Sequence, residues 1–415
     1  MQSQLRTTLP VLLSLLLGYG LLQMGNTLQG TLLSVRGGIE SYSAFEIGLV
    51  GTGFWMGLVL GSLYAGTLIR RVGHTRVFAA LASLASAAPL LHVLYVNPVL
   101  WVLERALTGF CFAGLFMVVE SWLNSASSSQ IRGQVLSIYG MVGLIAGISG
   151  QMLLPTYDPS RFQLFCVVSV VISLALVPVA LSRASAPSTA TGEAHIDVFR
   201  LYRQSPFGVV AAFLCGICTA SFFTMGPLLA QQIGLNETNT ALFMAIGTLG
   251  GFVMTWPFGW ISDRIDRRGL IVGVATVATV ILTVFVTMLP DGLPTWVIFG
   301  IVAIFGAVII PTYGIVIAHV NDFVPSGEFV SASGGLLIVQ GIGAATGPLV
   351  AGAAMSWAGP AGLAYTTIAA QVLMAVWGMY RMTMRSAPTA EAKEPFVAIP
   401  TAPVGTSLTP AHEAA

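Results

Sequence analysis

Charged residues are scarce in this sequence. Only 8% of its 415 residues are Asp, Glu, Lys or Arg, whereas 55% are hydrophobic. A soluble globular domain carries about 25% charged residues, so these charges are too few to cover a water-facing surface. We therefore expect most of the surface to contact a lipid bilayer. No basic patch large enough for nucleic acid is present, and we expect no nucleic-acid partner.

The sequence also lacks the motifs of enzymes and metalloproteins. Cys215 and Cys218 form a C-x-x-C inside an apolar run, but no further ligands lie nearby, so helix packing is favoured over a metal site. There is no Gly-Lys-Ser/Thr phosphate loop, no H-E-x-x-H and no convincing pair of nucleophile and base. We therefore predict no enzymatic activity, no bound metal and no cofactor.

Long apolar runs dominate the chain. A membrane-spanning helix needs about 20 apolar residues. Twelve runs meet that requirement, at residues 9–33, 44–69, 77–95, 99–123, 133–154, 162–181, 207–231, 240–261, 270–289, 295–318, 329–355 and 362–382. The predicted fold class is an all-α polytopic membrane protein with twelve transmembrane helices.

The basic residues indicate an orientation in the membrane. Arg105 lies inside the fourth run, and only Arg36 and Arg161 fall on the side opposite the chain ends. All the other Lys and Arg residues flank the runs on the side of the two termini. Since cytoplasmic loops are enriched in Lys and Arg, we expect both termini in the cytoplasm.

The chain divides into two similar halves. We predict an N-terminal six-helix bundle at 1–182, a small and polar cytoplasmic linker at 183–206, and a C-terminal bundle at 207–382. Residues 383–415 are rich in Ala, Pro and Thr, and we expect a disordered cytoplasmic tail. A basic loop after Gly66 returns after Gly259, 193 residues later (259 − 66), which indicates a duplicated six-helix unit.

The repeated loop resembles a motif of the major facilitator superfamily, G-x-x-x-D-R-x-G-R-R. In the first copy Gly66, Arg71 and Gly73 match, while Arg70 stands where the family has Asp. The second copy keeps four charged positions, Asp263, Arg264, Arg267 and Arg268. The resemblance covers residues 9–382 and implies two pseudo-symmetric six-helix bundles that transport small molecules.

Further residues narrow the resemblance to the bacterial YcaD-like subgroup. The matching segments are Asn26-Thr27 in the first run, Val118-Val119-Glu120-Ser121 in the fourth, and Arg132-Gly133, Tyr139 and Gly150-Gln151 around the fifth. The resemblance implies a bacterial inner-membrane protein.

The repeated loops are candidates for a cytoplasmic gate. Their arginines can reach carboxylates across the closed interface, although the positive-inside rule alone also explains them. Because the first loop lacks its acid, we predict that Glu120 supplies it by pairing with Arg71 or Arg132. The alternative for Glu120 is a solvated carboxylate at a helix end. The predicted gate residues are Gly66, Arg70, Arg71, Gly73, Glu120, Arg132, Asp263, Arg264, Arg267 and Arg268.

Polar residues inside the apolar runs are candidates for a substrate cavity. Gln23, Asn26 and Thr27 share one face of the first run at spacings i, i+3 and i+4. Arg105 is costly in lipid and should face a cavity or a partner, although packing alone also explains it. The weaker candidates are Gln151, Thr224, Tyr313 and Gln340, any of which could serve only as an interhelical hydrogen bond.

These features together predict a secondary active transporter that works by alternating access, with proton coupling and export as the working hypotheses. Glu104 and Glu120 are the carboxylates available for proton coupling, and their scarcity leaves a gradient-driven uniporter as an alternative. A transporter-like sensor without transport is a second alternative. We expect a monomer with a small-molecule substrate, H⁺ as coupling ion and the lipid bilayer as its partners.

Overall fold

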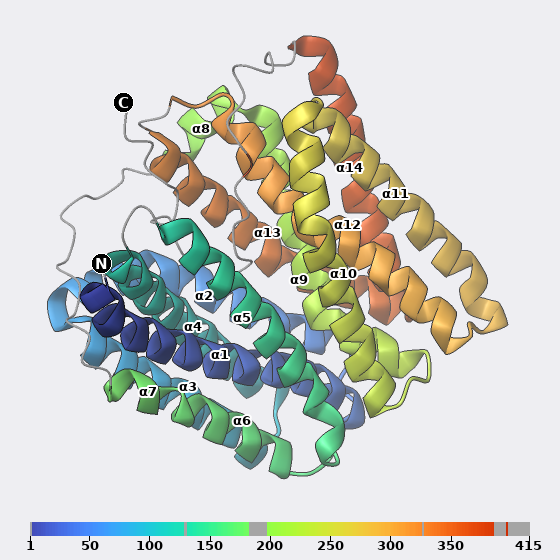
Figure 1. Cartoon of the computed structure of the whole chain (residues 1–415). Helices are drawn as coiled ribbons and strands as arrows, with labels where there is room; N and C mark the ends of the chain where they lie inside the picture. The colour runs from blue at the N-terminus through green and yellow to red at the C-terminus, as the bar shows by residue number, and fades with distance from the viewer. Residues whose placement is uncertain (1, 128–130, 182–196, 326–327, 386–395, 397–415) are drawn as a thin grey trace.

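The computed structural model describes residues 2–127, 131–181, 197–325, 328–385 and 396, and the side chains from residue 12 onward with a few exceptions. Within these ranges the regular structure is helical (Figure 1). The α-helices are α1 (Gln2–Ile39), α2 (Ala44–Val72), α3 (His74–Leu94), α4 (Pro98–Ala126), α5 (Arg132–Met152), α6 (Gln163–Leu174), α7 (Leu176–Ala180), α8 (Val198–Gln204), α9 (Pro206–Gln232), α10 (Glu237–Arg264), α11 (Arg267–Met288), α12 (Thr295–Asn321), α13 (Phe329–Ala358) and α14 (Ala361–Met384). Two single 3₁₀ turns, η1 (Leu154–Thr156) and η2 (Leu289–Asp291), follow α5 and α11.

The transmembrane helices follow the predicted spans. Eleven spans among the described residues are long and apolar enough to cross a bilayer, and they coincide with the second to twelfth predicted runs. The first predicted run lies within α1, which has 38 residues. Helices α6 and α7 together form the sixth span, Gln163–Ala180. The break follows Leu174, whose carbonyl would accept from residue 178, and Pro178 has no N–H to donate. Within the described residues the protein is therefore all-α, and α1 together with the eleven spans accounts for the twelve predicted transmembrane segments.

The structure describes part of the predicted linker and very little of the predicted tail. Helix α8 lies inside the predicted linker, and Asp197 caps it by accepting a hydrogen bond from the Arg200 backbone N–H. The sequence prediction had no helix there. The predicted tail 383–415 lies outside the described residues after Arg385, apart from Phe396.

Helix ends are set by local chemistry. Ser43 and Glu46 form a reciprocal capping box at the start of α2. Asn97 caps α4, and Pro98 occupies its first turn, where the missing N–H costs nothing. Only Gly73 separates α2 from α3, and its φ of 92° is a conformation that favours glycine. The connection between the two helices is therefore a tight turn at a single glycine.

Within each half, glycines bring one pair of helices into backbone contact, and the two pairs are equivalent. In the first half, a Cβ on Gly57 of α2 would lie 1.9 Å from the Ala106 carbonyl oxygen of α4. In the second half, a Cβ on Gly306 of α12 would lie 1.9 Å from the Gly247 carbonyl oxygen of α10. Pairs α2–α4 and α10–α12 occupy corresponding positions in a six-helix repeat. The same close packing thus recurs in both halves.

A second pair of contacts follows the same correspondence. Gly150 of α5 packs against the Met24 carbonyl of α1, and Gly343 of α13 packs against the Phe213 carbonyl of α9. The buried apolar residues form two large clusters, one drawn almost wholly from residues 12–179 and the other mainly from residues 201–375. Each half therefore has its own core, as two pseudo-symmetric bundles require.

The halves meet at one end of the molecule and diverge at the other. Figure 1 shows the helices of both halves converging near the end of α1, while the start of α1 and the end of α14 lie far apart. At the convergent end, Phe45 N–H donates to Ser356 Oγ at 3.0 Å. Gly48 of α2 also packs on the Pro348 carbonyl of α13. The diverging end carries the arginine-rich loops, and we call it the arginine-rich end.

Candidate functional site

A cavity of about 160 Å³ lies where α1, α2 and α9 meet, with contributions from α4, α5 and α10. Its lining contains both polar and aromatic side chains. Six of the eight predicted cavity residues line it, namely Gln23, Asn26, Thr27, Arg105, Gln151 and Thr224. The two halves of the chain thus share one cavity.

Arg105 is the charged residue of this lining. It is 6% exposed, and its guanidinium carbon lies 4.2 Å from the centre of the Phe54 ring. Gly109 lies one helical turn later on the same face of α4, and its lack of a side chain makes this contact possible. A Cβ at Gly109 would lie 2.0 Å from the Phe54 carbonyl oxygen, so only glycine allows α4 to approach α2 this closely. The spacing of Arg105 and Gly109, four residues apart, therefore has a structural reason.

The polar stripe of α1 faces the cavity as predicted by its spacing. Thr27 donates its hydroxyl to the Gln23 carbonyl oxygen of its own helix at 2.9 Å. Gly150 brings α5 against Thr27 and so places the neighbouring Gln151 beside the stripe. Both Asn26 Oδ1 and Gln151 Oε1 are buried without a hydrogen-bond partner. Such orphaned acceptors inside a cavity need a donor from water or a ligand.

Tyr313 and Gln340 do not line this cavity. Tyr313 of α12 packs against the core of the C-terminal half. The backbone of Gln340 on α13 abuts Gly216 of α9. Their helices were predicted correctly, but hydropathy alone does not show which way a single polar residue faces.

The sequence analysis missed the aromatic part of the lining. Phe54 and Trp55 of α2, Phe116 of α4 and Phe223 of α9 all contribute to it. Apolar residues in a span can face lipid, core or cavity, so no signal separated these four from their neighbours.

Glu120 differs from its predicted role. It is 2% exposed and accepts a hydrogen bond of 3.0 Å from the Tyr139 hydroxyl of α5. Tyr19 of α1 stacks on Tyr139, with ring centres 4.0 Å apart. The predicted pairing with Arg71 is wrong for this conformation, because Glu120 points into the bundle and Arg71 is exposed. The other predicted partner, Arg132, has a side chain outside the described residues.

Glu104 faces α3 and not the cavity. Its Oε2 lies 3.1 Å from Nδ1 of the fully buried His92, which also lies 2.8 Å from the Ala88 carbonyl oxygen. Glu104 and Arg105 are neighbours in sequence and point about 100° apart around α4. The two predicted proton-coupling carboxylates therefore lie in separate surroundings.

The first arginine-rich loop is mostly exposed. Arg70 donates to the Thr67 hydroxyl at 3.0 Å, close to Gly66. His74, which stands where the superfamily motif has an arginine, is 4% exposed and lies 3.1 Å from Ser121 Oγ of α4. It thus fastens α3 to α4.

The second loop is held by ion pairs. Arg267 is 1% exposed and contacts Asp263 Oδ1 at 3.0 Å and Asp322 Oδ1 at 3.4 Å. These contacts join α10, α11 and α12. Arg264 instead turns back over Trp260, 3.8 Å from its ring centre. The Phe396 backbone N–H donates to Asp263 at 3.0 Å.

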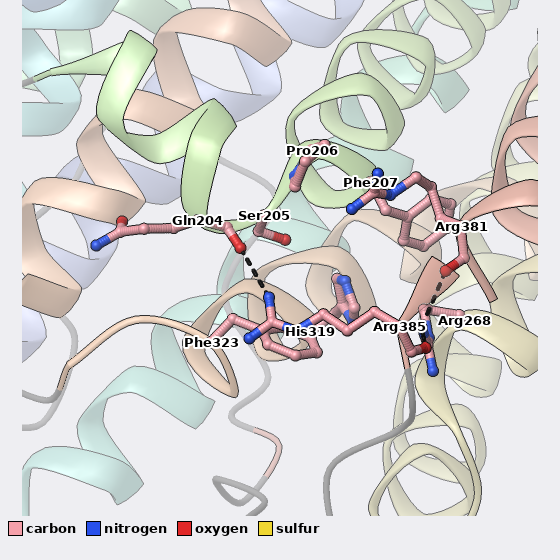
Figure 2. Close-up of a pocket in the computed structure, with 9 residues that line it drawn as sticks. All are labelled: Gln204, Ser205, Pro206, Phe207, Arg268, His319, Phe323, Arg381 and Arg385. Carbon is pink, nitrogen blue, oxygen red and sulfur yellow. Dashed lines mark hydrogen bonds between the residues drawn. The ribbon is translucent and has the colours of Figure 1, made fainter. Parts of the chain in front are cut away.

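Asp266 and Arg268 form a further ion pair at this loop. Burial opposes ionisation of Asp266, but hydrogen bonds from the Arg268 side chain and backbone outweigh it and lower the pKa of Asp266. Arg268 also donates to the Arg385 carbonyl oxygen at 2.7 Å, and Arg385 donates to the Gln204 carbonyl oxygen at 3.2 Å (Figure 2). Figure 2 shows these bonds linking the ends of α14 and α8 around a small pocket beside His319. The arginines satisfy backbone carbonyls at helix ends.

Sequence comparison finds relatives over most of the chain. The family model described as "Major Facilitator Superfamily" matches residues 15–348. The MFS-type transporter YcaD of Escherichia fergusonii is 28% identical over 343 residues, which cover 82% of this chain and 87% of the relative. The MFS-type transporter Ent638_1421 of Enterobacter sp. (strain 638) is also 28% identical, over 345 residues and the same shares of each chain.

Solved structures share the fold. A mutant of the nucleoside transporter NupG superposes with a TM-score of 0.76 at 12% identity, covering 90% of this chain and 99% of that one. A bacterial homologue of the human lysosomal transporter Spinster, solved inward-facing and unoccupied, gives a TM-score of 0.69 at 16% identity and covers 94% and 98%. The membrane-spanning helices, the repeated glycine contacts and the match to residues 15–348 show that this chain belongs to the Major Facilitator Superfamily, and that it resembles the YcaD-type transporters within it.

Proposed function

We propose that this protein is a secondary active transporter that moves a small organic molecule by alternating access. The observation that carries this proposal is the cavity shared by α1, α2 and α9, which sits between the two halves and holds unpartnered polar atoms. Binding between paired six-helix repeats is the general arrangement in such transporters. The transporters found by sequence and by structure support the same function.

The conformation fits one step of such a cycle. The contacts between halves at Phe45 and Gly48 lie at the end opposite the arginine-rich loops. The excess of Lys and Arg supports an orientation in which the arginine-rich end and both termini face the cytoplasm, with the protein in the bacterial inner membrane. In this proposal the present conformation faces inward, and rocking of one half against the other opens the opposite end.

Proton coupling has a candidate carrier in Glu120. This carboxyl is buried, contacts the Tyr139 hydroxyl through one oxygen, and has no hydrogen-bond partner on the other. It lies between α4, α5 and α1, helices that also contribute to the cavity. Glu104 is the alternative carrier, through its contact with His92. A uniporter would use neither.

Transport is tested with the purified chain, as a monomer, in proteoliposomes. A metabolite and drug library is first screened for thermal stabilisation, and each stabilising compound is then assayed for uptake with and without a pH gradient. Uptake that the gradient accelerates, and that Glu120→Gln makes independent of pH, supports the coupled carrier. Uptake indifferent to pH in the wild type supports the uniporter. Compounds that bind but never cross contradict transport and favour a sensor.

A further inference from the structure

The cavity presents one cation and no acid. Among the side chains that line it, Arg105 is the charged one, and none is Asp, Glu or His. Arg105 is 6% exposed, and its Nη1 has no hydrogen-bond partner. Its guanidinium carbon lies 4.2 Å from the centre of the Phe54 ring, in a cation–π contact. Among the residues that the structure describes, no carboxylate forms an ion pair with this buried guanidinium.

An uncompensated buried arginine is costly within a membrane. A bound anion would offset this cost by supplying the missing negative charge, because charge-assisted hydrogen bonds to a guanidinium are strong. The neighbouring carboxylate cannot do so, since Glu104 points toward His92 on α3. Glu120 is hydrogen-bonded to Tyr139 and does not line the cavity.

The rest of the lining describes the body of the ligand. Phe54, Trp55, Phe116 and Phe223 offer aromatic surface, which a fully hydrated inorganic anion would not use. In the same lining, the side-chain oxygens of Asn26 and Gln151 have no hydrogen-bond donor among the described residues. A ligand that satisfies all of these groups has one anionic group, a flat or apolar body, and a hydroxyl or N–H donor.

We propose that the substrates of this transporter are amphipathic organic monoanions, such as hydroxylated aromatic carboxylates, whose carboxylate pairs with Arg105 and whose ring lies against Phe54 and Trp55. This proposal rests on the proposed transport function and names its substrate class. An organic cation of the same shape is excluded by charge repulsion in a site without a carboxylate. A neutral analogue loses the ion pair and keeps the apolar contacts.

The test compares three probes of one shape against detergent-purified wild type, with affinity measured by calorimetry and by thermal stabilisation. The probes are 3-phenyllactate, its amide, and 3-phenylpropylamine. We expect phenyllactate to bind roughly tenfold or more tightly than its amide, and the amine not to bind. 3-Phenylpropanoate, which lacks the hydroxyl, should bind more weakly than phenyllactate.

Variants assign the preference to the cavity. Arg105→Gln should bind phenyllactate no better than the amide, and Arg105→Lys should recover part of the preference. The matched control is Arg161→Gln, since Arg161 pairs with Asp158 on the exposed surface, and this variant should behave as wild type. Should Arg105→Gln fail to fold, Phe54→Leu is the second variant, and it should weaken the binding of phenyllactate and of its amide while keeping their order.

Several outcomes overturn the assignment. These are equal binding of anion and amide, preference for the amine, no binding of any probe by folded wild type, stabilisation by chloride alone, or an anion preference that survives Arg105→Gln. Failure of the proposed transport function looks different. In that case phenyllactate binds in an Arg105-dependent way, yet no bound anion crosses the proteoliposome membrane. If only cations were transported, the proposed transport function would hold and the proposed substrate class would be refuted.

Discussion

Replacing Gly109 by alanine should separate α2 from α4 and disturb the cavity at once. The new Cβ would lie 2.0 Å from the Phe54 carbonyl oxygen and 2.9 Å from the Leu58 backbone nitrogen. A carbon and a carbonyl oxygen normally approach to about 3.3 Å, so the helices must part by about 1.3 Å. Neither neighbour is a flexible side chain that can move aside.

The energetic cost follows from this contact. Overpacking by one methyl group costs about 1–3 kcal/mol, and alanine regains about 1 kcal/mol of helix propensity relative to glycine. The matched control is Gly273→Ala on α11, where an added Cβ meets nothing within 4 Å. The control gains the propensity without the clash, so the two variants should differ by the clash alone, about 1–3 kcal/mol.

The assay is thermal unfolding of both variants in the same detergent, followed by binding of 3-phenyllactate. We expect Gly109→Ala to melt below Gly273→Ala and to bind the probe more weakly, because Arg105 lies one turn away and moves with α4. Equal melting temperatures for the two variants would show that α2 and α4 do not approach as closely as the structure has them. Normal binding despite lowered stability would instead show that the α2–α4 contact at Gly109 does not position Arg105 in the cavity.

Three further predictions concern other parts of the molecule. Glu120→Arg should abolish monodisperse expression, measured by size-exclusion chromatography, because it buries a cation beside Tyr139, whereas Glu120→Gln should express normally. Asp266→Asn should lower thermal stability near pH 7 but not at a pH below the lowered pKa of Asp266. The fold lowers this pKa, so the ionised carboxylate stabilises the protein at a pH above the ordinary pKa of Asp, and this contribution is lost as the pH falls through the lowered pKa. Equal stability at pH 7 would contradict this. Phe45→Cys with Ser356→Cys should form a disulfide that stops transport, and unimpaired flux in the oxidised protein would refute the alternating role of that end.

The transmembrane helices could be predicted from the sequence because hydropathy and length are local properties. The single-residue turn at Gly73 could not be read from hydropathy, because the apolar runs end at residue 69 and resume at residue 77, whereas both helices continue up to Gly73. Helix α8 was missed because its seven residues lack a long apolar run. Its stability comes from the Asp197 cap and from contacts with α9 and α13, which only the folded chain brings together.

The candidate cavity could be predicted in part. Gln23, Asn26 and Thr27 share a helical face, and that face proved to line the cavity. Tyr313 and Gln340 are single polar residues with no such periodicity, so their direction depends on the rotation of α12 and α13 in the bundle. The predicted pairing of Glu120 with Arg71 was wrong for a related reason. The position of Glu120 along α4 suggested a place near the arginines, but the rotation of α4 in the bundle directs its side chain toward Tyr139.

The two halves pack against each other at the convergent end but keep largely separate apolar cores, and this arrangement bears on how the protein could move. Within a half, glycines such as Gly57 and Gly306 place backbone on backbone. Between the halves, Gly48 and Gly352 bring α2 and α13 into the same kind of backbone contact, and single hydrogen bonds join them at the convergent end. Separating α2 from α13 would leave most of each apolar core packed. The two halves should therefore move as rigid bodies, with Arg105 and the α1 stripe keeping their geometry while access to the cavity changes ends.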